Sequence, residues 1–355
     1  MKKLNLAVVG ITGIVGLQFL RGLDERNIAV DQLYFFASKA SAGKQLTFRG
    51  KTYTIEELTE RSFDNKAIDF SFFTAGTPVS EKYVKIAAKH SVVIDNSTYL
   101  RMDKDTPLVV PEVNAHAIAG HQNVIACPNC STIQAVVALK PLHDKYKLKR
   151  VVVSTYQAVS GSGKFGIVDL LTGIEATIDD ASELNKQIAS TTYEDDHLVD
   201  SINLDQTGYA LKTYDKPIAY NVIPHIDTFE VDGYTKEETK VMNETKKIMS
   251  LPADFPITAT AIRVPVINGH SESINVEFES DFELNELIEL LKNAEGITYD
   301  ETPTPAKYSG VDTVAVGRVR RDLSVPYGIN LFVVSDNIRK GAATNAIQII
   351  EEMTR

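Results

Sequence analysis

Cysteine is scarce in this chain. Cys127 and Cys130 are its only two cysteines among 355 residues. So few thiols exclude a disulfide framework, and we expect both to be reduced. The Cys-x-x-Cys spacing matches half of a zinc site, but no second pair completes it, so no metal site is expected. Two alternatives remain open at this point: a dithiol redox centre of the thioredoxin type, and two small residues buried in the core.

The chain also lacks an apolar run long enough to span a bilayer. Its first residues, Met1-Lys2-Lys3-Leu4, lead directly into a strand pattern rather than a signal peptide, so a cytoplasmic protein is expected. Basic residues are outnumbered, with 37 Lys and Arg against 47 Asp and Glu and a formal net charge of -10. This balance argues against nucleic-acid and membrane partners but allows a local cationic pocket for an anionic substrate. The length favours two domains.

A glycine-rich turn follows the first predicted strand. Residues 4–9 form a short apolar run, and a helical pattern continues through Leu17, Leu20 and Leu23. Strand, glycine turn and helix in this order are typical of a dinucleotide-binding fold, in which backbone N–H groups approach a pyrophosphate. The spacing is Gly-x-x-Gly-x-x-Gly rather than the common Gly-x-Gly-x-x-Gly, so a simple strand-to-helix turn is the alternative. The candidate cofactor contacts of this turn are Gly10, Thr12, Gly13, Ile14, Val15 and Gly16.

The second predicted strand, residues 32–37, does not end in an acidic residue. An Asp or Glu there would bind the ribose 2′-hydroxyl of NAD. The chain instead continues with Ser38, Lys39, Ala40 and Ser41, and a cluster of hydroxyl and ammonium groups suits a 2′-phosphate. These residues favour NADP, with an ordinary polar loop as the alternative.

Strands and helices then alternate, which predicts a parallel sheet with helices on both faces. A strand entering a turn is expected over residues 68–76, a helix over 80–89 and a strand over 91–95. Loops at the carboxyl ends of such strands line the ligand crevice, so Arg101 and Cys130 are expected on the same rim. The helical pattern that starts at Ser131 places Cys130 at a helix N-terminus, where the pKa of a thiol falls.

The second half of the chain has a different pattern. Strands are predicted over residues 150–157 and 257–266 and around 274–278, a flexible small-residue loop over 160–166, and an amphipathic helix at the C-terminus that could return to the first domain. We expect a second, more antiparallel domain here. The apolar residues predicted to form the core face of the helix after the loop are Ile167, Leu170, Leu171, Ile174 and Ile178.

Taken in order along the chain, several motifs resemble the bacterial aspartate-semialdehyde dehydrogenase family. They are the glycine turn, Pro128-Asn129-Cys130-Ser131-Thr132, Tyr156-Gln157-Ala158-Val159-Ser160-Gly161, Arg263-Val264-Pro265-Val266 leading to Gly269-His270-Ser271-Glu272, and Ser335-Asp336-Asn337 near Lys340-Gly341. The resemblance covers essentially the whole chain. It implies a Rossmann-type dinucleotide-binding domain (residues 1–129 and 337–355, closed by the C-terminal helix) and an α+β catalytic, substrate-binding and dimerisation domain of the glyceraldehyde-phosphate dehydrogenase-like type (residues 130–336).

The resemblance also implies a reaction. NADPH reduces L-aspartyl-4-phosphate to L-aspartate 4-semialdehyde with release of inorganic phosphate, through a thioester on Cys130, in the biosynthesis of lysine, diaminopimelate, threonine and methionine. His270 would be the acid/base group and Gln157 would orient the acyl group. Arg263 would bind the substrate carboxylate and Glu237, with Glu238 as the competing acid, its ammonium. Lys240, Arg101 and Asn129 would form the phosphate site and Ser160 would touch both ligands. The further cofactor contacts implied are Ser38, Lys39, Ser41, Thr54, Ala75, Gly76, Ser160, Gly161 and Asn337.

One departure bears on the cofactor: where relatives commonly carry an arginine after the second strand, this chain has Lys39 followed by Ala40. Lysine neutralises a phosphate but lacks the planar fork, so the preference for NADP over NAD is less strict. The alternatives to the implied function are N-acetyl-gamma-glutamyl-phosphate reductase, glyceraldehyde-phosphate dehydrogenase, a catalytically silent NADP-binding regulatory protein and a dithiol redox protein. The resemblance implies a homodimer, with a homotetramer as the alternative.

Overall fold

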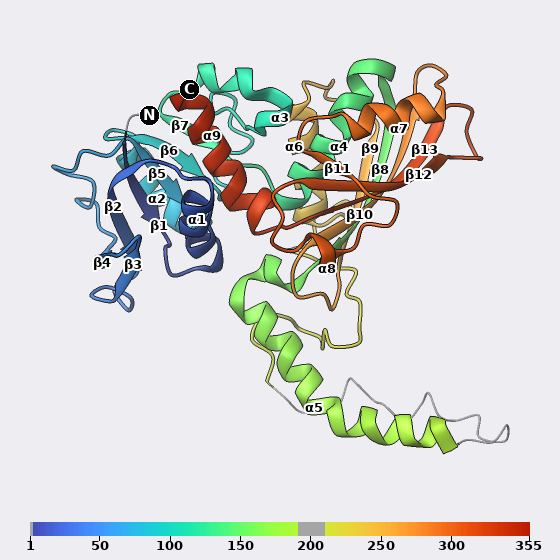
Figure 1. The fold of residues 1–355 in the computed structure, drawn as a ribbon, viewed down its shortest axis with the longest axis horizontal. Helices are drawn as coiled ribbons and strands as arrows, with labels where there is room; N and C mark the ends of the chain where they lie inside the picture. The colour runs from blue at the N-terminus through green and yellow to red at the C-terminus, as the bar shows by residue number, and fades with distance from the viewer. Residues whose placement is uncertain (1–2, 191–209) are drawn as a thin grey trace.

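Two β-sheets dominate the computed structural model, which describes residues 3–190 and 210–355. Figure 1 shows them side by side, with helices packed between and around them. The predicted combination of a Rossmann-type dinucleotide-binding fold and a second α+β region is confirmed. In the part of the chain that is described, no helix has the length and apolar character needed to cross a membrane.

The first sheet has the strand order β3-β4-β2-β1-β5-β6-β7, and all its neighbours are parallel except β3 and β4. The central strand β1 is apolar and largely buried because helices cover both faces of the sheet. The elements are β1 (Leu4–Val9), α1 (Ile14–Glu25), β2 (Val30–Ala37), β3 (Gln45–Phe48), β4 (Lys51–Glu57), β5 (Phe70–Phe73), α2 (Thr77–Ala87), β6 (Val92–Asp95), α3 (Pro111–Asn114), the 3-10 helix η1 (Ala115–Gly120) and β7 (Val124–Ala126).

The second sheet has the order β11-β12-β13-β10-β8-β9, with antiparallel pairing at its centre and parallel pairing at both edges. Its core lies against α4, whose apolar side chains share one cluster with those of β8, β10 and β13. The elements are α4 (Cys130–Tyr146), β8 (Leu148–Gln157), the 3-10 helix η2 (Val159–Ser162), α5 (Gly163–Ser190), α6 (Lys236–Ile248), β9 (Ile257–Arg263), β10 (His270–Phe278), α7 (Leu284–Lys292), β11 (Ile297–Tyr299), α8 (Pro305–Tyr308), β12 (Val314–Arg321) and β13 (Gly328–Ser335).

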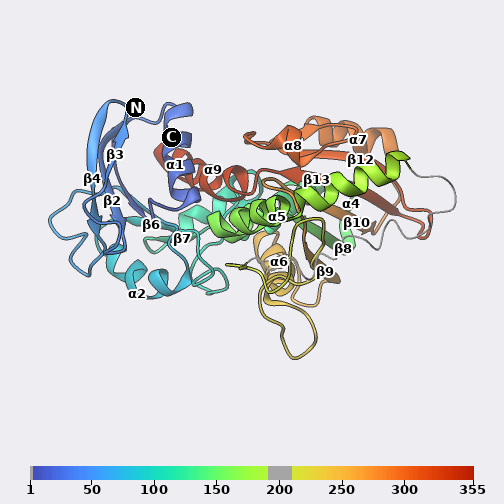
Figure 2. The same ribbon diagram turned by 90° about the horizontal axis from the view of Figure 1, so that it is seen from below.

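The end of the chain runs back to the first sheet. After β13, a π-helical turn η5 (Arg339–Ala343) leads into α9 (Thr344–Thr354). Ala346, Ile347 and Ile350 are buried in the same apolar cluster as Leu6 and Phe19, and Figure 2 shows α9 beside α1. The domain boundaries at 129/130 and 336/337 stay a prediction.

Three expectations from the sequence were wrong. The segment 160–166 is helical, because η2 leads directly into α5, so it is not a flexible loop. The strand expected over 257–266 ends at Arg263, since Pro265 has no N–H for a ladder. Leu171 and Ile178 are 43% and 52% exposed, so they do not belong to the core of this chain. Their helix, α5, projects from the body in Figure 1.

Candidate active site

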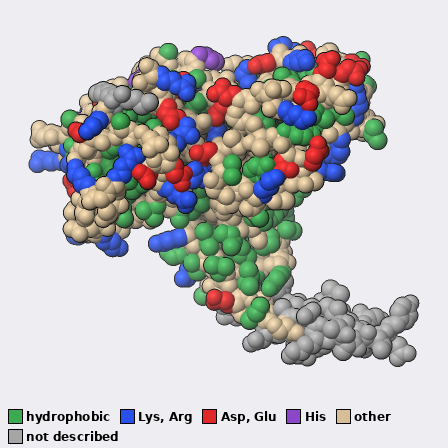
Figure 3. Space-filling view, viewed as in Figure 1, with side chains coloured by type: hydrophobic (Ala, Val, Ile, Leu, Met, Phe, Trp, Pro, Cys, Tyr) green, Lys and Arg blue, Asp and Glu red, His purple; other side chains and the backbone are tan. Residues whose placement is uncertain are grey.

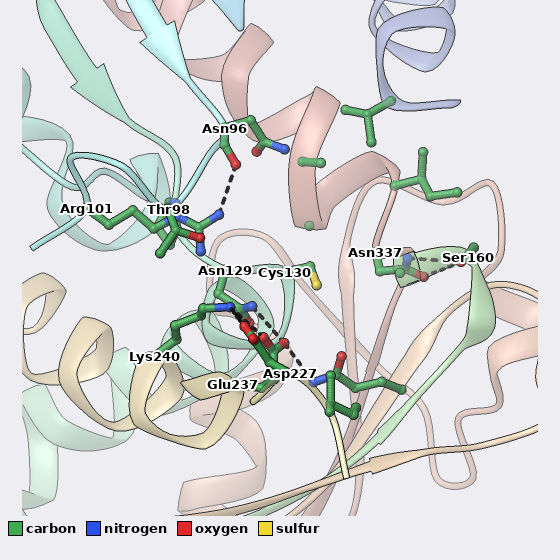
Figure 4. A pocket seen from close by; sticks show the side chains of 18 of the residues that line it. Asn96, Thr98, Arg101, Asn129, Cys130, Ser160, Asp227, Glu237, Lys240 and Asn337 are labelled. Atoms are coloured by element: carbon green, nitrogen blue, oxygen red, sulfur yellow. Dashed lines mark hydrogen bonds and ion pairs between the residues drawn. The ribbon is translucent and has the colours of Figure 1, made fainter. Parts of the chain in front are cut away.

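Cys130 is the first residue of α4 and faces a cavity of about 400 Å³ between the two sheets. The helix begins here because the side chain of Asn129 caps it, accepting hydrogen bonds from the N–H groups of Ser131 (2.9 Å) and Thr132 (3.3 Å). Figure 4 shows this cavity, with Arg101, Asn129, Glu237 and Lys240 to one side of the sulfur of Cys130. The substrate-binding residues predicted from the sequence all line it together with Cys130: Arg101, Asn129, Gln157, Ser160, Glu237, Lys240 and Arg263.

The expected fall in the pKa of Cys130 does not occur. Burial and the nearby carboxylate of Glu237 raise the pKa of this thiol to about 12, although Arg101 and Arg263 act in the opposite direction. The position at a helix N-terminus was predicted correctly, but the dipole is outweighed by the loss of water around the sulfur. The thiol form therefore predominates at neutral pH. Cys127 is fully buried in the core of the first sheet, as expected for a small packing residue.

Glu237 is the centre of the polar network in this cavity. Its Oε1 accepts hydrogen bonds from Asn129 Nδ2 (2.8 Å) and Gln157 Nε2 (3.1 Å), and its Oε2 lies 3.2 Å from Lys240 Nζ. Burial opposes its ionisation, yet Lys240 and these amide groups hold the pKa of Glu237 below its ordinary value. Lys240 also pairs with Asp227 at 2.7 Å. Cation and anion are thus held next to each other in the cavity that Cys130 faces.

Glu238, the competing acid, serves a different purpose. Its Oε2 accepts the N–H of Thr235 (2.7 Å) and the hydroxyl of Thr235 accepts the N–H of Glu238, which is a capping box at the start of α6. Its Oε1 accepts the N–H of Ala261 on β9 at 2.9 Å. Glu238 does not line the cavity, whereas Glu237 does, so the geometry selects Glu237 as the candidate ligand of an ammonium group.

Arg263 lies at the end of β9, in register with Gln157 at the end of β8. Its Nη1 donates to the carbonyl oxygen of Ala158 at 2.7 Å. Its Nε is buried and has no partner among the described residues. A buried donor without a partner is costly, so this edge of the guanidinium is suited to bind a carboxylate.

His270 is fully buried at the start of β10 and lies behind Gly161 rather than on the cavity wall. Its Nδ1 accepts a hydrogen bond from the N–H of Ala158 (3.0 Å), so the neutral ring carries its proton on Nε2. Burial and the charge of Arg263 hold the pKa of His270 well below its usual value. A Cβ atom at Gly161 would lie 3.1 Å from Nε2, so glycine lets this edge of the ring approach the cavity. This tautomer donates from Nε2 and does not accept there.

The predicted cofactor turn lies beside a second groove, of about 520 Å³. Gly10 has a φ of +90°, and a Cβ there would lie 2.9 Å from the backbone nitrogen of Ala75. Gly13 stands at the N-cap of α1 and offers no side chain to its N–H groups, which leaves them for an anion such as a pyrophosphate. These features fit a dinucleotide. The predicted cofactor residues that line the groove are Gly10, Thr12, Gly13, Ser38, Lys39 and Ala75.

The other predicted cofactor residues lie elsewhere. Val15, Ser160, Gly161 and Asn337 line the cavity of Cys130 and not the groove. Ser160 and Asn337 are joined by a hydrogen bond of 3.0 Å from Nδ2 to the hydroxyl. Ile14, Gly16, Ser41, Thr54 and Gly76 line neither the groove nor the cavity.

Four residues of these sites escaped sequence reasoning. Glu244 binds Arg101 Nη1 at 3.1 Å, and Asp227 lines the cavity as a partner of Lys240. A Cβ on Gly341 would lie 2.9 Å from the Cβ of Cys130, so glycine makes room for the Cys130 side chain. Glu57 lines the cofactor groove because β4 pairs with β2 and brings it beside Ala37. Each depends on a contact between distant segments, and only Gly341, within a recognised motif, carried a local signal.

Two family models match the chain: the semialdehyde dehydrogenase NAD binding domain over residues 5–121 and the semialdehyde dehydrogenase dimerisation domain over residues 139–340. The aspartate-semialdehyde dehydrogenase of Aquifex aeolicus is 46% identical over 361 residues, which cover 99% of this chain and 98% of that protein. The Helicobacter pylori enzyme is 43% identical, covering 98% of each chain. A solved structure of aspartate semialdehyde dehydrogenase II from Vibrio cholerae, complexed with ASA, superposes with a TM-score of 0.87 at 40% identity and covers 100% of this chain and 99% of that one.

Proposed function

The chain belongs to the aspartate-semialdehyde dehydrogenase family, and on that premise we propose that it converts L-aspartyl-4-phosphate and NADPH into L-aspartate 4-semialdehyde, phosphate and NADP through a thioester on Cys130. The observation that carries this proposal is a single cavity in which a helix-terminal thiol faces Arg101, Lys240 and Arg263 with Glu237 between them. That set complements a substrate with one phosphate, one carboxylate and one ammonium group.

In the first step, the sulfur of Cys130 attacks the acyl carbon and the bond to phosphate breaks. Arg101, Lys240 and the Asn129 turn bind the phosphate and stabilise the negative charge that develops on it. The proton of the thiol leaves with the phosphate, so the step balances although the pKa of the free thiol is high. Arg263 holds the carboxylate and Glu237 the ammonium, while Gln157 orients the acyl group.

In the second step the thioester is reduced. A bound nicotinamide supplies the hydride. His270 donates a hydrogen bond from its Nε2–H to the oxygen of the tetrahedral intermediate and stabilises the negative charge there, and the aldehyde forms when the C–S bond breaks. The sulfur takes up a proton from water, which restores the thiol. His270 therefore acts on the intermediate rather than as the base that removes the proton of the free thiol.

We further propose NADP as the cofactor and a homodimer as the working form. Ser38 and Lys39 line the groove next to β2, where a 2′-phosphate would lie. Apolar side chains gather where α5 leaves the body (Figure 3), and Phe165, Leu171 and Ile178 are exposed there. A continuous apolar patch of this kind is typical of an interface, and the matched dimerisation model spans this region. Light scattering should give twice the monomer mass for the wild type, and Leu171→Glu should reduce it.

The reaction is tested in the reverse direction, as phosphate-dependent reduction of NADP by aspartate semialdehyde. Wild type is expected to turn over only when phosphate is present, and Cys130→Ser to be inactive. Absence of turnover in wild type would overturn the reaction, and turnover of Cys130→Ser at the wild-type rate would remove Cys130 as the nucleophile. Replacing the substrate with N-acetyl-glutamate semialdehyde tests the nearest alternative, and equal turnover would contradict the assigned roles of Glu237 and Arg263.

A further inference from the structure

Glu244 is a carboxylate buried on α6 that joins two segments of the proposed active site. It is 1% exposed. Its Oε1 accepts a hydrogen bond from Arg101 Nη1 (3.1 Å), and its Oε2 accepts the backbone N–H of Asn129 (2.6 Å). One side chain thus fixes both the loop that carries Arg101 and the turn that precedes Cys130.

Arg101 is held in a defined orientation by these contacts. Its Nη2 donates to the carbonyl oxygen of Asn96 at 3.0 Å, so both terminal nitrogens are bound to protein. Its Nε is buried and has no partner among the described residues. Burial disfavours the charged guanidinium, but Glu244 more than compensates, and the pKa of Arg101 stays above its ordinary value. The guanidinium is therefore charged and held in one orientation, with only its Nε left without a protein partner among the described residues.

Helix α6 secures the same loop at a second point. Lys247 Nζ donates to the carbonyl oxygens of Arg101 (2.7 Å), Asp103 (2.6 Å) and Thr106 (2.9 Å). Glu237 and Lys240, from the first turns of α6, enter the cavity. One helix therefore carries two proposed substrate ligands and the anchors of a third.

We propose that Glu244 is a positioning residue that sets the place of the phosphate-binding Arg101 relative to the nucleophile Cys130. This inference rests on the proposed function. Glu244 does not line the cavity, so it acts through Arg101 and the Asn129 turn rather than on the substrate. The two donors require two acceptor oxygens, which a carboxylate supplies and a side-chain amide does not.

The test is Glu244→Gln, which preserves size and removes one acceptor. Whichever way the amide is turned, its NH₂ group faces either Arg101 or the N–H of Asn129, and one contact is lost. The concentration of phosphate giving half-maximal rate should rise by about tenfold or more. The KM values for NADP and aspartate semialdehyde should stay within about twofold of wild type, because their proposed ligands are not held by Glu244.

Glu238→Gln is the matched control. Glu238 is also a buried carboxylate of α6 that accepts two hydrogen bonds, but both come from backbone N–H groups and it lies in the capping box. Its substitution should lower thermal stability and leave the phosphate dependence unchanged. If it weakens phosphate binding as much as Glu244→Gln does, the effect is one of helix stability and the inference is overturned. Should Glu244→Gln fail to fold, Glu244→Asp keeps the charge but is one methylene short, and the same rise is expected.

A double-mutant cycle with Arg101→Lys decides whether Glu244 acts through Arg101. The two substitutions should be non-additive in their effect on phosphate dependence, and additive effects would overturn the inference. Protection of Cys130 by phosphate against iodoacetamide provides a readout that needs no turnover. If wild type lacks turnover but phosphate protects it and protects Glu244→Gln more weakly, the proposed function fails and the positioning role stands. If both proteins turn over with equal phosphate dependence, the positioning role alone fails.

Discussion

The substrate cavity and the cofactor groove present different kinds of surface to a ligand. Three of the charged side chains that line the cavity, Arg101, Glu237 and Arg263, are buried. The polar groups there also hold one another, as Glu237 holds Asn129, Gln157 and Lys240. The groove is lined largely by backbone and small side chains, such as Gly10, Gly13 and Ala75, with Lys39 exposed at its edge. Interactions between buried charges are strong and depend on their geometry, whereas interactions between exposed charges are screened by water and salt. A similar substitution should therefore change kcat/KM much more in the cavity than in the groove.

Arg263→Lys should show the largest effect. Lysine keeps the positive charge, but its ammonium cannot bind the carbonyl oxygen of Ala158 and form a planar fork with a carboxylate at the same time. We expect kcat/KM for aspartate semialdehyde to fall between about a hundredfold and a thousandfold, with the KM for NADP little changed. Steady-state kinetics with each substrate varied in turn would measure this. A loss of less than about fivefold would mean that a point charge is sufficient in the cavity, so that binding there depends on geometry no more than it does in the groove.

The reactivity of Cys130 should rise steeply with pH. Because burial and Glu237 raise the pKa of the thiol to about 12, the thiolate fraction of the free enzyme increases about tenfold for each pH unit throughout the range from 7 to 9. The rate of inactivation by iodoacetamide should follow it, a rise of about a hundredfold in all. Cys127→Ser should behave as wild type, since Cys127 is buried. A plateau below pH 8.5 would show that the helix dipole prevails over burial.

Gly341→Ala should lower turnover between about tenfold and fiftyfold. The added Cβ would lie 2.9 Å from the Cβ and 3.3 Å from the Cα of Cys130, so Cys130 or the π-helical turn must shift. Gly120→Ala is the control, because nothing lies within 4 Å of a Cβ at that position and it should be silent. Stopped-flow measurement of the first turnover separates the chemical step from product release. An unchanged first turnover would show that the cavity tolerates displacement of the thiol.

Local patterns made the positions of the site residues predictable. The glycine turn, the start of α4 at Cys130 and the pairing of the Gln157 and Arg263 strand ends all follow from short motifs that stand next to regular elements. Side chains at the ends of neighbouring strands meet at one edge of a sheet, so residues far apart in sequence were expected together. These residues do line one cavity, as expected, and their roles stay predictions.

Properties that depend on packing could not be predicted in this way. Glu244 lies 143 positions from Arg101, and no pattern in α6 distinguishes it from an ordinary helical glutamate. The direction of the pKa shift of Cys130 depends on how much water the fold removes and on a carboxylate from another helix. The outer face of α5 has the same apolar spacing as a core face, so the sequence does not say whether this chain or a partner covers it.

The smallest effects are expected in the cofactor groove, from an opposed pair of charges. Lys39 and Glu57 both line it, and both are exposed, so each should contribute about 1 kcal/mol or less to binding of a 2′-phosphate. Lys39→Ala should lower kcat/KM for NADPH about fivefold, and Glu57→Gln should raise it by a similar or smaller factor, because one removes attraction and the other repulsion. Neither substitution should change kcat/KM for NADH, which lacks that phosphate. Lys44 lies in the same loop but outside the groove, so Lys44→Ala should leave kcat/KM for both cofactors unchanged. Equal responses of NADPH and NADH would contradict a 2′-phosphate site at Lys39. A fall of a hundredfold for NADPH would show that this edge of the groove is as dependent on side-chain charge as the substrate cavity is, because a screened surface lysine cannot contribute that much.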